Sequence, residues 1–296
     1  MKKLSLLFTL ISFCVFSQEK KFITPDLPKN QVYQYHISSA SSLKSPKGKS
    51  YHAPFTVNQD VELTYLFNDG NDKIFSWKII NYEHLHEGKK EEKNDCNCNK
   101  VAYRNQLTVY FRTDSLGAYK KINNLSQVRG NLLKNIAEQE KLLSKNDKNI
   151  FERVKRNPEG VISNIEEDII IFSRYFGIEN KNSVNTLFAR RNNFPFGLKS
   201  KPFKVVLSVL SEEKNLKINV KNEFDKHKAE DEDYNIFRFN QDVEKEKKHY
   251  QLIADEEYVF SKENFRLLSA KLTAKEISNF HNDGIYDYQY SITQKE

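Results

Sequence analysis

The spacing of apolar side chains changes twice along the chain, and this change constrains the fold more than any other feature of the sequence. Over residues 32–112 apolar residues recur at every second position, over 125–176 they recur three or four positions apart, and over 203–293 the alternation returns. Alternation is typical of half-buried strands, whereas a spacing of three to four is typical of amphipathic helices. The sequence therefore predicts strands, then helices, then strands.

This order predicts an α+β fold, because a chain of βαβ units would alternate the two spacings along its whole length. We expect a curved antiparallel β-sheet that is wrapped around the central helical segment. We also expect a single domain over residues 18–296, although a division near Asn182 would leave the helices as a linker between two sheet halves. With 21 phenylalanines and 15 tyrosines against 9 glycines and 7 prolines, the composition favours long regular elements around an aromatic core.

Three local signals set the expected boundaries of elements. The run Asn-Asp-Gly-Asn-Asp at 68–72 separates two alternating stretches and predicts a β-hairpin. Residues 38–50 are rich in serine and lysine, so we expect a flexible loop there. A short helix is expected over 150–156, and the spacing of Ser163 and Glu166 is that of a capping box, which predicts the start of the next helix near Ser163.

Residues 1–17 have the pattern of a secretory signal peptide. Two lysines precede an apolar stretch over 4–16 that is too short to span a bilayer, and Ser17 is the expected cleavage position. Cys14 follows Phe13 rather than the small residue of a lipoprotein signal, which argues against lipidation there. No later stretch is apolar enough to predict a membrane helix. We therefore expect a secreted or periplasmic protein whose mature chain has no transmembrane segment.

Positive charge along the chain is offset by neighbouring acids. The formal net charge is +7, and it falls by two when Lys2 and Lys3 are removed with the signal peptide. Lysines and glutamates are interleaved in the remaining charged runs, as over 89–93 and 244–248. A nucleic-acid groove requires basic residues without such alternation, so no nucleic-acid partner is expected.

A resemblance to known proteins rests on the order of these elements and on short stretches of sequence. The passages Thr113–Gly117 and Ile122–Asn124 lead into the helices, and an Asn/Pro/Phe/Gly loop over 192–197 leads into the closing strands. In this layout the chain resembles uncharacterised exported proteins of Bacteroidota, which implies a secreted or periplasmic protein. More distantly, the architecture is similar to that of the periplasmic lipoprotein carriers, and this likeness implies, by analogy alone, an apolar ligand.

Two histidines and two cysteines form a candidate metal or redox site. His84 and His86 would share one face of a strand, and the following loop could bring Cys96 and Cys98 back over them. Four nitrogen and sulfur ligands would suit Zn²⁺ or copper. In the oxidising surroundings of an exported protein the two cysteines could instead form a small strained disulfide. A third interpretation is that the thiols and imidazoles are simply exposed.

Aromatic side chains gather around the end of the third expected helix and the loop that follows it. They could line an apolar pocket between the helices and the sheet, and the alternative is ordinary core packing. The residues of this candidate ligand site are Phe172, Tyr175, Phe176, Phe188, Phe194 and Phe196.

Catalytic motifs with a known mechanism are missing from the sequence, which has no Gly-x-Ser-x-Gly elbow, glycine-rich phosphate loop or His-Glu-x-x-His. The acids Glu166, Glu167 and Asp168 lie at the expected start of a helix, where the helix dipole favours carboxylates and no catalytic explanation is needed. We therefore expect a non-enzymatic binding protein of the cell envelope, without a cofactor, whose partner is a hydrophobic small molecule or an envelope protein. The alternative is a metal-binding or redox-responsive protein.

Overall fold

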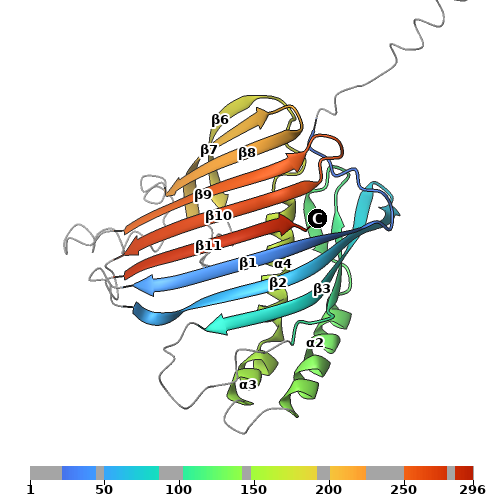
Figure 1. The fold of residues 1–296 in the computed structure, drawn as a ribbon, viewed down its shortest axis with the longest axis vertical. Helices are drawn as coiled ribbons and strands as arrows, with labels where there is room; N and C mark the ends of the chain where they lie inside the picture. Colours follow the sequence, from blue (N-terminus) through green and yellow to red (C-terminus); the bar gives the residue numbers. More distant parts are fainter. Residues whose placement is uncertain are drawn as a thin grey trace, which may run out of the picture.

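One open antiparallel sheet dominates the structure, and the first and last strands of the chain pair at its centre (Figure 1). The computed structural model describes residues 22–44, 50–86, 103–141, 148–191, 201–224, 250–278 and 284–295. Within these residues the strands lie in the order β5-β4-β3-β2-β1-β11-β10-β9-β8-β7-β6. They are β1 (Val32–Lys44), β2 (Ser50–Asp69), β3 (Asp72–His86), β4 (Thr108–Thr113), β5 (Tyr119–Ile122), β6 (Ser183–Arg191), β7 (Lys201–Ser211), β8 (Asn215–Phe224), β9 (Tyr250–Ser261), β10 (Leu267–Ser278) and β11 (Gly284–Gln294).

The helices connect the two opposite edges of this sheet. From β1 the chain adds strands outward to the edge strand β5, and after the helices it resumes at the other edge with β6 and adds strands inward to β11. The helices are α2 (Leu125–Glu140), α3 (Lys148–Arg156) and α4 (Pro158–Ser173). Because β5 and β6 lie at opposite edges, the connecting segment has to cross the sheet, and α4 runs across one of its faces (Figure 1).

Side chains alternate between a packed face and a solvated face of the sheet. In β8, Leu216, Ile218 and Val220 are buried, whereas the residues between them are only partly buried. In β1, Tyr33 and Tyr35 are buried in the same alternating manner. An antiparallel sheet with helices on one face and solvent on the other produces this pattern. The packed face is the one that α4 covers.

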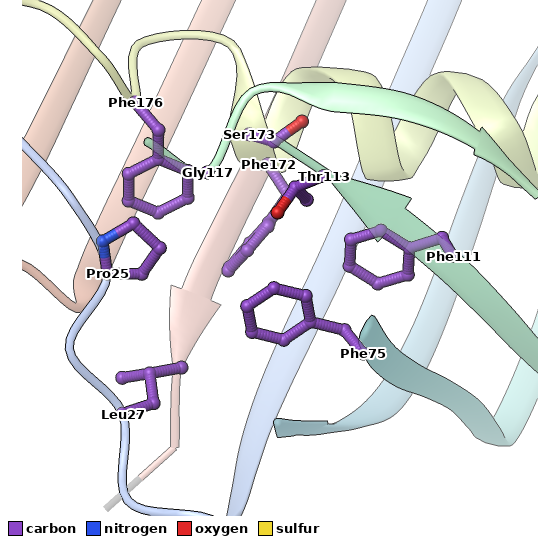
Figure 2. Close-up of a pocket in the computed structure, with 9 residues that line it drawn as sticks. All are labelled: Pro25, Leu27, Phe75, Phe111, Thr113, Gly117, Phe172, Ser173 and Phe176. Atoms are coloured by element: carbon purple, nitrogen blue, oxygen red, sulfur yellow. The ribbon is translucent and has the colours of Figure 1, made fainter. Parts of the chain in front are cut away.

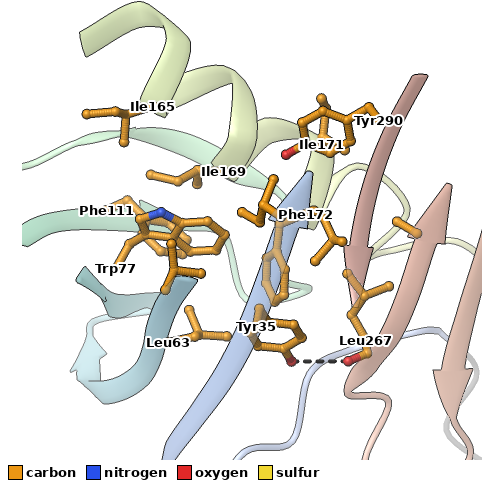
Figure 3. Close-up of a cluster of buried hydrophobic side chains, with 14 of the residues drawn as sticks. Tyr35, Leu63, Trp77, Phe111, Ile165, Ile169, Ile171, Phe172, Leu267 and Tyr290 are labelled. Carbon is orange, nitrogen blue, oxygen red and sulfur yellow. Dashed lines mark hydrogen bonds between the residues drawn. The ribbon is translucent and has the colours of Figure 1, made fainter. Parts of the chain in front are cut away.

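The helix α4 places large apolar side chains against the packed face. The ring of Phe172 lies edge-on to Tyr35 of β1 and to Trp77 of β3, with ring centroids 5.4 and 5.6 Å apart (Figure 3). The buried hydroxyl of Tyr35 donates a hydrogen bond of 3.1 Å to the carbonyl of Leu267 in β10. Edge-to-face rings with satisfied phenol groups are typical of a well-packed aromatic core.

The expected fold class is confirmed in its coarse form, an open antiparallel sheet with a few helices. The expected amphipathic helix is confirmed as α2, which buries Val128, Leu132 and Ile136, one residue per turn. None of the helices described is long and apolar enough to cross a membrane.

The hairpin expected at 68–72 is also confirmed. Asp69 at the end of β2 pairs with Asp72 at the start of β3. Between them Gly70 has a φ of +64°, which glycine adopts readily and which the tight turns of hairpins require. The turn chemistry therefore fixes the register of the two longest neighbouring strands.

The flexible loop expected over 38–50 is wrong for most of that range. The strand β1 continues to Lys44 and β2 begins at Ser50. Residues 38–44 pair with β11 on one side and, with irregularities in register after Ser41, with β2 on the other. Two flanking strands therefore hold this polar stretch in the sheet, because tertiary pairing overrides a weak local preference. Residues 45–49 lie outside the described part of the chain.

The expected start of the last helix near Ser163 is wrong as well. The helix α4 begins at Pro158, with Asn157 as its N-cap, and the Asn157 side chain accepts a hydrogen bond of 3.2 Å from the backbone N–H of Gly160. Proline is favoured at the first position of a helix because its missing N–H has no intrahelical partner there in any case. Ser163 and Glu166 are therefore interior residues, and the capping box is absent.

The spacing of apolar residues predicts neither β5 nor β6, and these are the two edge strands. In β6, Val184 and Leu187 are 71% and 41% exposed, so an edge strand here lacks the buried alternation by which strands are recognised. The loop expected over 192–197 lies outside the described residues.

Candidate functional site

A pocket of about 210 Å³ lies between α4 and the packed face of the sheet. Its walls come from β1, β2, β11, the turn before β4, and the middle of α4. The polar residues that line it are Ser39, Gln59, Arg104, Asn164, Glu167 and Asp168. These residues are distant in the sequence, and the pairing of β1 with both β2 and β11 brings three of the walls together.

Asp168 is the most deeply buried acid of the pocket and is held from two strands. Its Oδ2 accepts a hydrogen bond of 2.5 Å from Nε2 of Gln59 in β2, and its Oδ1 accepts one of 2.8 Å from the hydroxyl of Tyr290 in β11. Burial raises the pKa of Asp168, while the charge of Arg104 and these two hydrogen bonds act to lower it. The two donors orient the carboxyl group and attach α4 to the centre of the sheet.

Arg104 supplies the positive charge of the pocket. The residue is only 6% exposed, and its guanidinium lies over the ring of Tyr82 at 4.6 Å from the centroid. This stacking and the nearby Asp168 stabilise a cation that burial alone would disfavour. The pocket wall therefore contains a buried arginine whose charge is balanced within the protein.

Glu167 is an acid of the pocket for which the described part of the chain provides no partner. No hydrogen bond or ion pair to its carboxylate occurs among the residues that the structure describes. Burial and the neighbouring Asp168 raise the pKa of Glu167 to about 7, against a smaller opposing effect of Arg174. A carboxyl group with this pKa changes its charge near neutral pH and faces the pocket.

Two further polar atoms of the pocket are buried without a hydrogen-bond partner. They are Oε1 of Gln59, a residue that is 2% exposed, and Nε of Arg104. Buried polar atoms in folded proteins nearly always have a partner, which can be protein, water or a ligand. Both atoms are enclosed, so a ligand in the pocket meets the Glu167 carboxylate rather than either of them.

Three tyrosines of β11 complete the wall. Tyr286, Tyr288 and Tyr290 are spaced two apart and therefore share the packed face of the strand. Burial raises the pKa of Tyr288 and of Tyr290, and the charges of nearby acids raise both further. These phenols are consequently neutral at physiological pH and offer ring faces and hydroxyl groups.

A second buried acid, Glu256 of β9, shows how a paired carboxylate looks in this protein. Its Oε2 is 3.0 Å from Nη1 of Arg174 and accepts a hydrogen bond of 2.9 Å from the Tyr175 hydroxyl. Its Oε1 accepts a hydrogen bond of 2.9 Å from Nδ2 of Asn222. Both oxygens are satisfied, so this cluster attaches the end of α4 to the sheet and leaves nothing for a ligand.

The structure places three residues of the expected aromatic ligand site in the core. Phe172, Tyr175 and Phe176 are each at most 5% exposed. The void beside Phe172 and Phe176 measures about 10 Å³, and Figure 2 shows the rings of Phe75 and Phe111 turned toward it. This is about the space of one water molecule. The described half of the site is therefore packed.

The structure does not describe the side chains of the other three residues of that site. Phe188 lies on β6, but its side chain is outside the described part, and so are Phe194 and Phe196 altogether. An apolar ligand site formed by all six residues stays a prediction.

The histidine and cysteine site also stays a prediction. His84 and His86 lie at the end of β3, two residues apart as expected. Their side chains are outside the described part of the chain, and so are Cys96 and Cys98 altogether. Within the part of the chain that the structure describes, no group of three histidines, cysteines or acids is placed to hold a metal ion.

Sequence reasoning missed the polar pocket. It assigned Glu167 and Asp168 to the first turn of a helix, whereas they lie in the third turn of α4, facing the sheet. The signal that could have found them is a group of three acids, Glu166 to Asp168, between apolar residues of the same helix. The alternating tyrosines 286, 288 and 290 are a second such signal.

Comparisons with known proteins assign the chain to no family. No protein-family model matches the sequence, and no curated protein is similar to it. A solved structure described as "Lipid-protein interactions in lipovitellin" aligns with 91% of this chain at 11% identity and a TM-score of 0.48. This chain spans 25% of the length of that lipovitellin chain. The structure of DynF from the dynemicin biosynthesis pathway of Micromonospora chersina aligns with 94% of this chain and 87% of its own, at 7% identity and a TM-score of 0.20. Neither likeness is close enough to support an argument about the ligand.

Proposed function

We propose that this protein is an exported, non-enzymatic binding protein of the cell envelope, and that it holds a small amphipathic ligand in the pocket between α4 and the sheet. The observation that carries the proposal is the pocket of about 210 Å³ whose wall includes buried polar atoms without partners. The signal-peptide pattern of residues 1–17 supports export to the periplasm or the exterior.

The size of the pocket supports a ligand because protein interiors are close-packed. This pocket is partly open to solvent, so it interrupts that packing with a space that a ligand can enter. The void beside Phe172, about 10 Å³, shows how closely the same helix packs elsewhere. A space that is lined by polar groups and is large enough for several water molecules holds either ordered water or a ligand.

The chemistry of the wall supports an amphipathic ligand. Ile37 of β1 and Val57 of β2 provide apolar surface, and the rings of the β11 tyrosines add to it. The charged groups of Arg104, Glu167 and Asp168 and the amides of Gln59 and Asn164 are the polar groups of the same wall. Binding pockets for small molecules combine these two kinds of lining.

The arrangement of α4 supports the finer expectation for the fold, in which the sheet curves around the helical segment. Side chains of α4 contact β3 through Phe172 and β11 through Asp168, and the residues that follow the helix contact β9 through Arg174. One helix reaches strands on both sides of the centre of the sheet, as a concave packed face would allow. We infer that this concave face forms the pocket.

Native mass spectrometry of the full chain, purified from its own cells, tests the proposed function. The variant Ser39→Phe fills the pocket from β1, and Ala40→Phe is its control, because residue 40 is the next in the strand and points to the opposite face. We expect the parent and Ala40→Phe to retain a small molecule and Ser39→Phe to lose it. A parent protein found only at its apo mass would contradict the proposal, and so would a ligand that Ser39→Phe keeps.

A further inference from the structure

The unpaired groups of the pocket favour a hydrogen-bond donor as the ligand. Among the residues that the structure describes, neither the carboxylate of Glu167 nor the enclosed Oε1 of Gln59 has a hydrogen-bond partner. One donor is without a partner, Nε of Arg104. Since Gln59 is 2% exposed and its Nε2 is already bound to Asp168, its Oε1 is an enclosed acceptor of a residue that lines the pocket.

The charges of the pocket favour a positively charged ligand. The charge of Arg104 faces Asp168 and the ring of Tyr82, so it is compensated within the protein. Arg174, the other cation near Glu167, is paired with Glu256 at 3.0 Å. When Glu167 is ionised, its charge is therefore the one on this wall without a compensating partner. A buried charge of this kind is costly unless an opposite charge meets it.

The tyrosines of β11 suit the same kind of ligand. Tyr286, Tyr288 and Tyr290 line the pocket, and the raised pKa of Tyr288 and of Tyr290 keeps these two phenols neutral. The faces of their rings attract cations, and this attraction strengthens in a site from which water is excluded. An anion would find no such advantage against these rings or beside two acids.

We propose that the pocket binds a small amphipathic molecule that carries a protonated amine, with the ammonium group at the Glu167 carboxylate and the apolar part against Ile37 and Val57. This inference rests on the proposed function, because it names the class of ligand for the same pocket. The competing outcome is an anionic ligand held by the unpaired Nε of Arg104.

A series of three probes with the same hydrocarbon chain and different charge tests the inference. Isothermal titration calorimetry of the full chain at pH 8 compares n-hexylammonium, 1-hexanol and hexanoate. We expect n-hexylammonium to bind at least about tenfold more tightly than 1-hexanol, and hexanoate to bind most weakly. A tenfold ratio corresponds to about 1.4 kcal/mol, a modest value for one buried charge pair.

Two variants assign the preference to the pocket. Glu167→Gln should reduce the ratio of the affinities for n-hexylammonium and 1-hexanol to near one. Glu159→Gln, in the exposed first turn of the same helix, should leave the ratio as in the parent.

The outcomes separate the two proposals. If 1-hexanol or hexanoate binds as tightly as the amine, the inference about charge is overturned and the proposed function stands. If the amine preference survives in Glu167→Gln, the assignment to this pocket is overturned. If no probe binds to the parent, the inference is overturned, and the native mass spectrum of the parent decides whether the proposed function stands.

Discussion

Two sites on α4, one turn apart, show opposite ways of burying a helix against a sheet. At Phe172 the helix meets Tyr35, Trp77 and Phe176 ring to ring and leaves a void of about 10 Å³. At Asp168 it meets hydrogen-bond donors from two strands and borders a pocket of about 210 Å³. The aromatic site is densely packed, whereas the polar site is spacious and includes a carboxylate without a partner among the described residues.

The difference shows where stability and function are located along the helix. Aromatic rings fill space, and their edge-to-face contacts add to the stability of the folded protein, so their cluster acts as the core. Acids and amides hold fixed positions through directed hydrogen bonds, which leave space that only a polar molecule can fill. If this division is right, changes at the aromatic site should lower stability, and changes at the polar site should alter binding and pH dependence more than stability.

The largest effect is expected from Phe172→Ala in the aromatic site. The ring is 3% exposed and contacts strands on two sides, so its removal leaves a large cavity. We expect a loss of about 3–5 kcal/mol in the free energy of unfolding, measured by denaturant titration. The control Phe67→Ala removes a ring that is 48% exposed and should cost less than about 0.5 kcal/mol. Equal losses in the two variants would contradict the assignment of Phe172 to the core.

The second effect concerns the turn that borders the aromatic site. Gly117 has a φ of +100°, and a Cβ there would lie 2.6 Å from Cδ of Pro25 and 3.1 Å from Cβ of Phe176. Gly117→Ala should therefore cost about 2–4 kcal/mol, through backbone strain and displaced neighbours. Gly130→Ala is the control, because it lies in α2 with open space around it and should stabilise the helix by about 0.5–1 kcal/mol. Thermal melts of both variants should shift in opposite directions, and a stabilised Gly117→Ala would refute the close packing of this turn.

A smaller effect is expected at the polar site from Tyr290→Phe. The substitution keeps the ring but removes the donor to Oδ1 of Asp168. One oxygen of a buried carboxylate then lacks a partner, at a cost of about 1–3 kcal/mol. Tyr110→Phe, on an exposed residue of β4, provides the baseline. If the two variants unfold at the same denaturant concentration, the hydrogen bond does not hold α4 to the sheet.

The smallest effect on stability is expected from Glu167→Gln, and its sign depends on pH. The pKa of about 7 in the folded protein lies above the usual glutamate pKa of 4.5, so folding disfavours the ionised form. The resulting penalty is absent below pH 4.5, grows as the pH rises to 7, and is constant above it. The groups that set this pKa are Asp168 and Arg174, together with burial.

Glu167→Gln removes the penalty, so the variant should match the parent near pH 4 and be more stable by about 1–2 kcal/mol at pH 8. Unfolding titrations at both pH values measure the difference. Glu159→Gln, on an exposed residue of the same helix, should show no such dependence on pH. If the difference in stability were the same at the two pH values, the pKa of Glu167 would not be raised by folding.

Features that depend on local sequence were predictable. The hairpin follows from a glycine with positive φ between two alternating strands, and α2 follows from apolar residues four positions apart. The start of α4 was not predicted, because both a capping box and a proline at the first helical position are valid signals and only the second is used.

The polar pocket could not be derived from the sequence for a physical reason. Gln59, Asp168 and Tyr290 meet through pairings that join the two ends of the chain, and no local rule states that β1 pairs with β11. The aromatic cluster was predicted as a ligand site because several of its residues lie close together in the sequence. A binding site made of single polar residues on separate strands becomes visible only when the sheet is assembled.

A crystal structure of the full chain soaked with n-hexylammonium at pH 8 tests the central claim most directly. The account predicts density for the amine between α4 and β11, with its nitrogen within hydrogen-bond distance of the Glu167 carboxylate. Density beside Phe172 instead, or a pocket that holds only water or has closed upon its own side chains, would contradict the account.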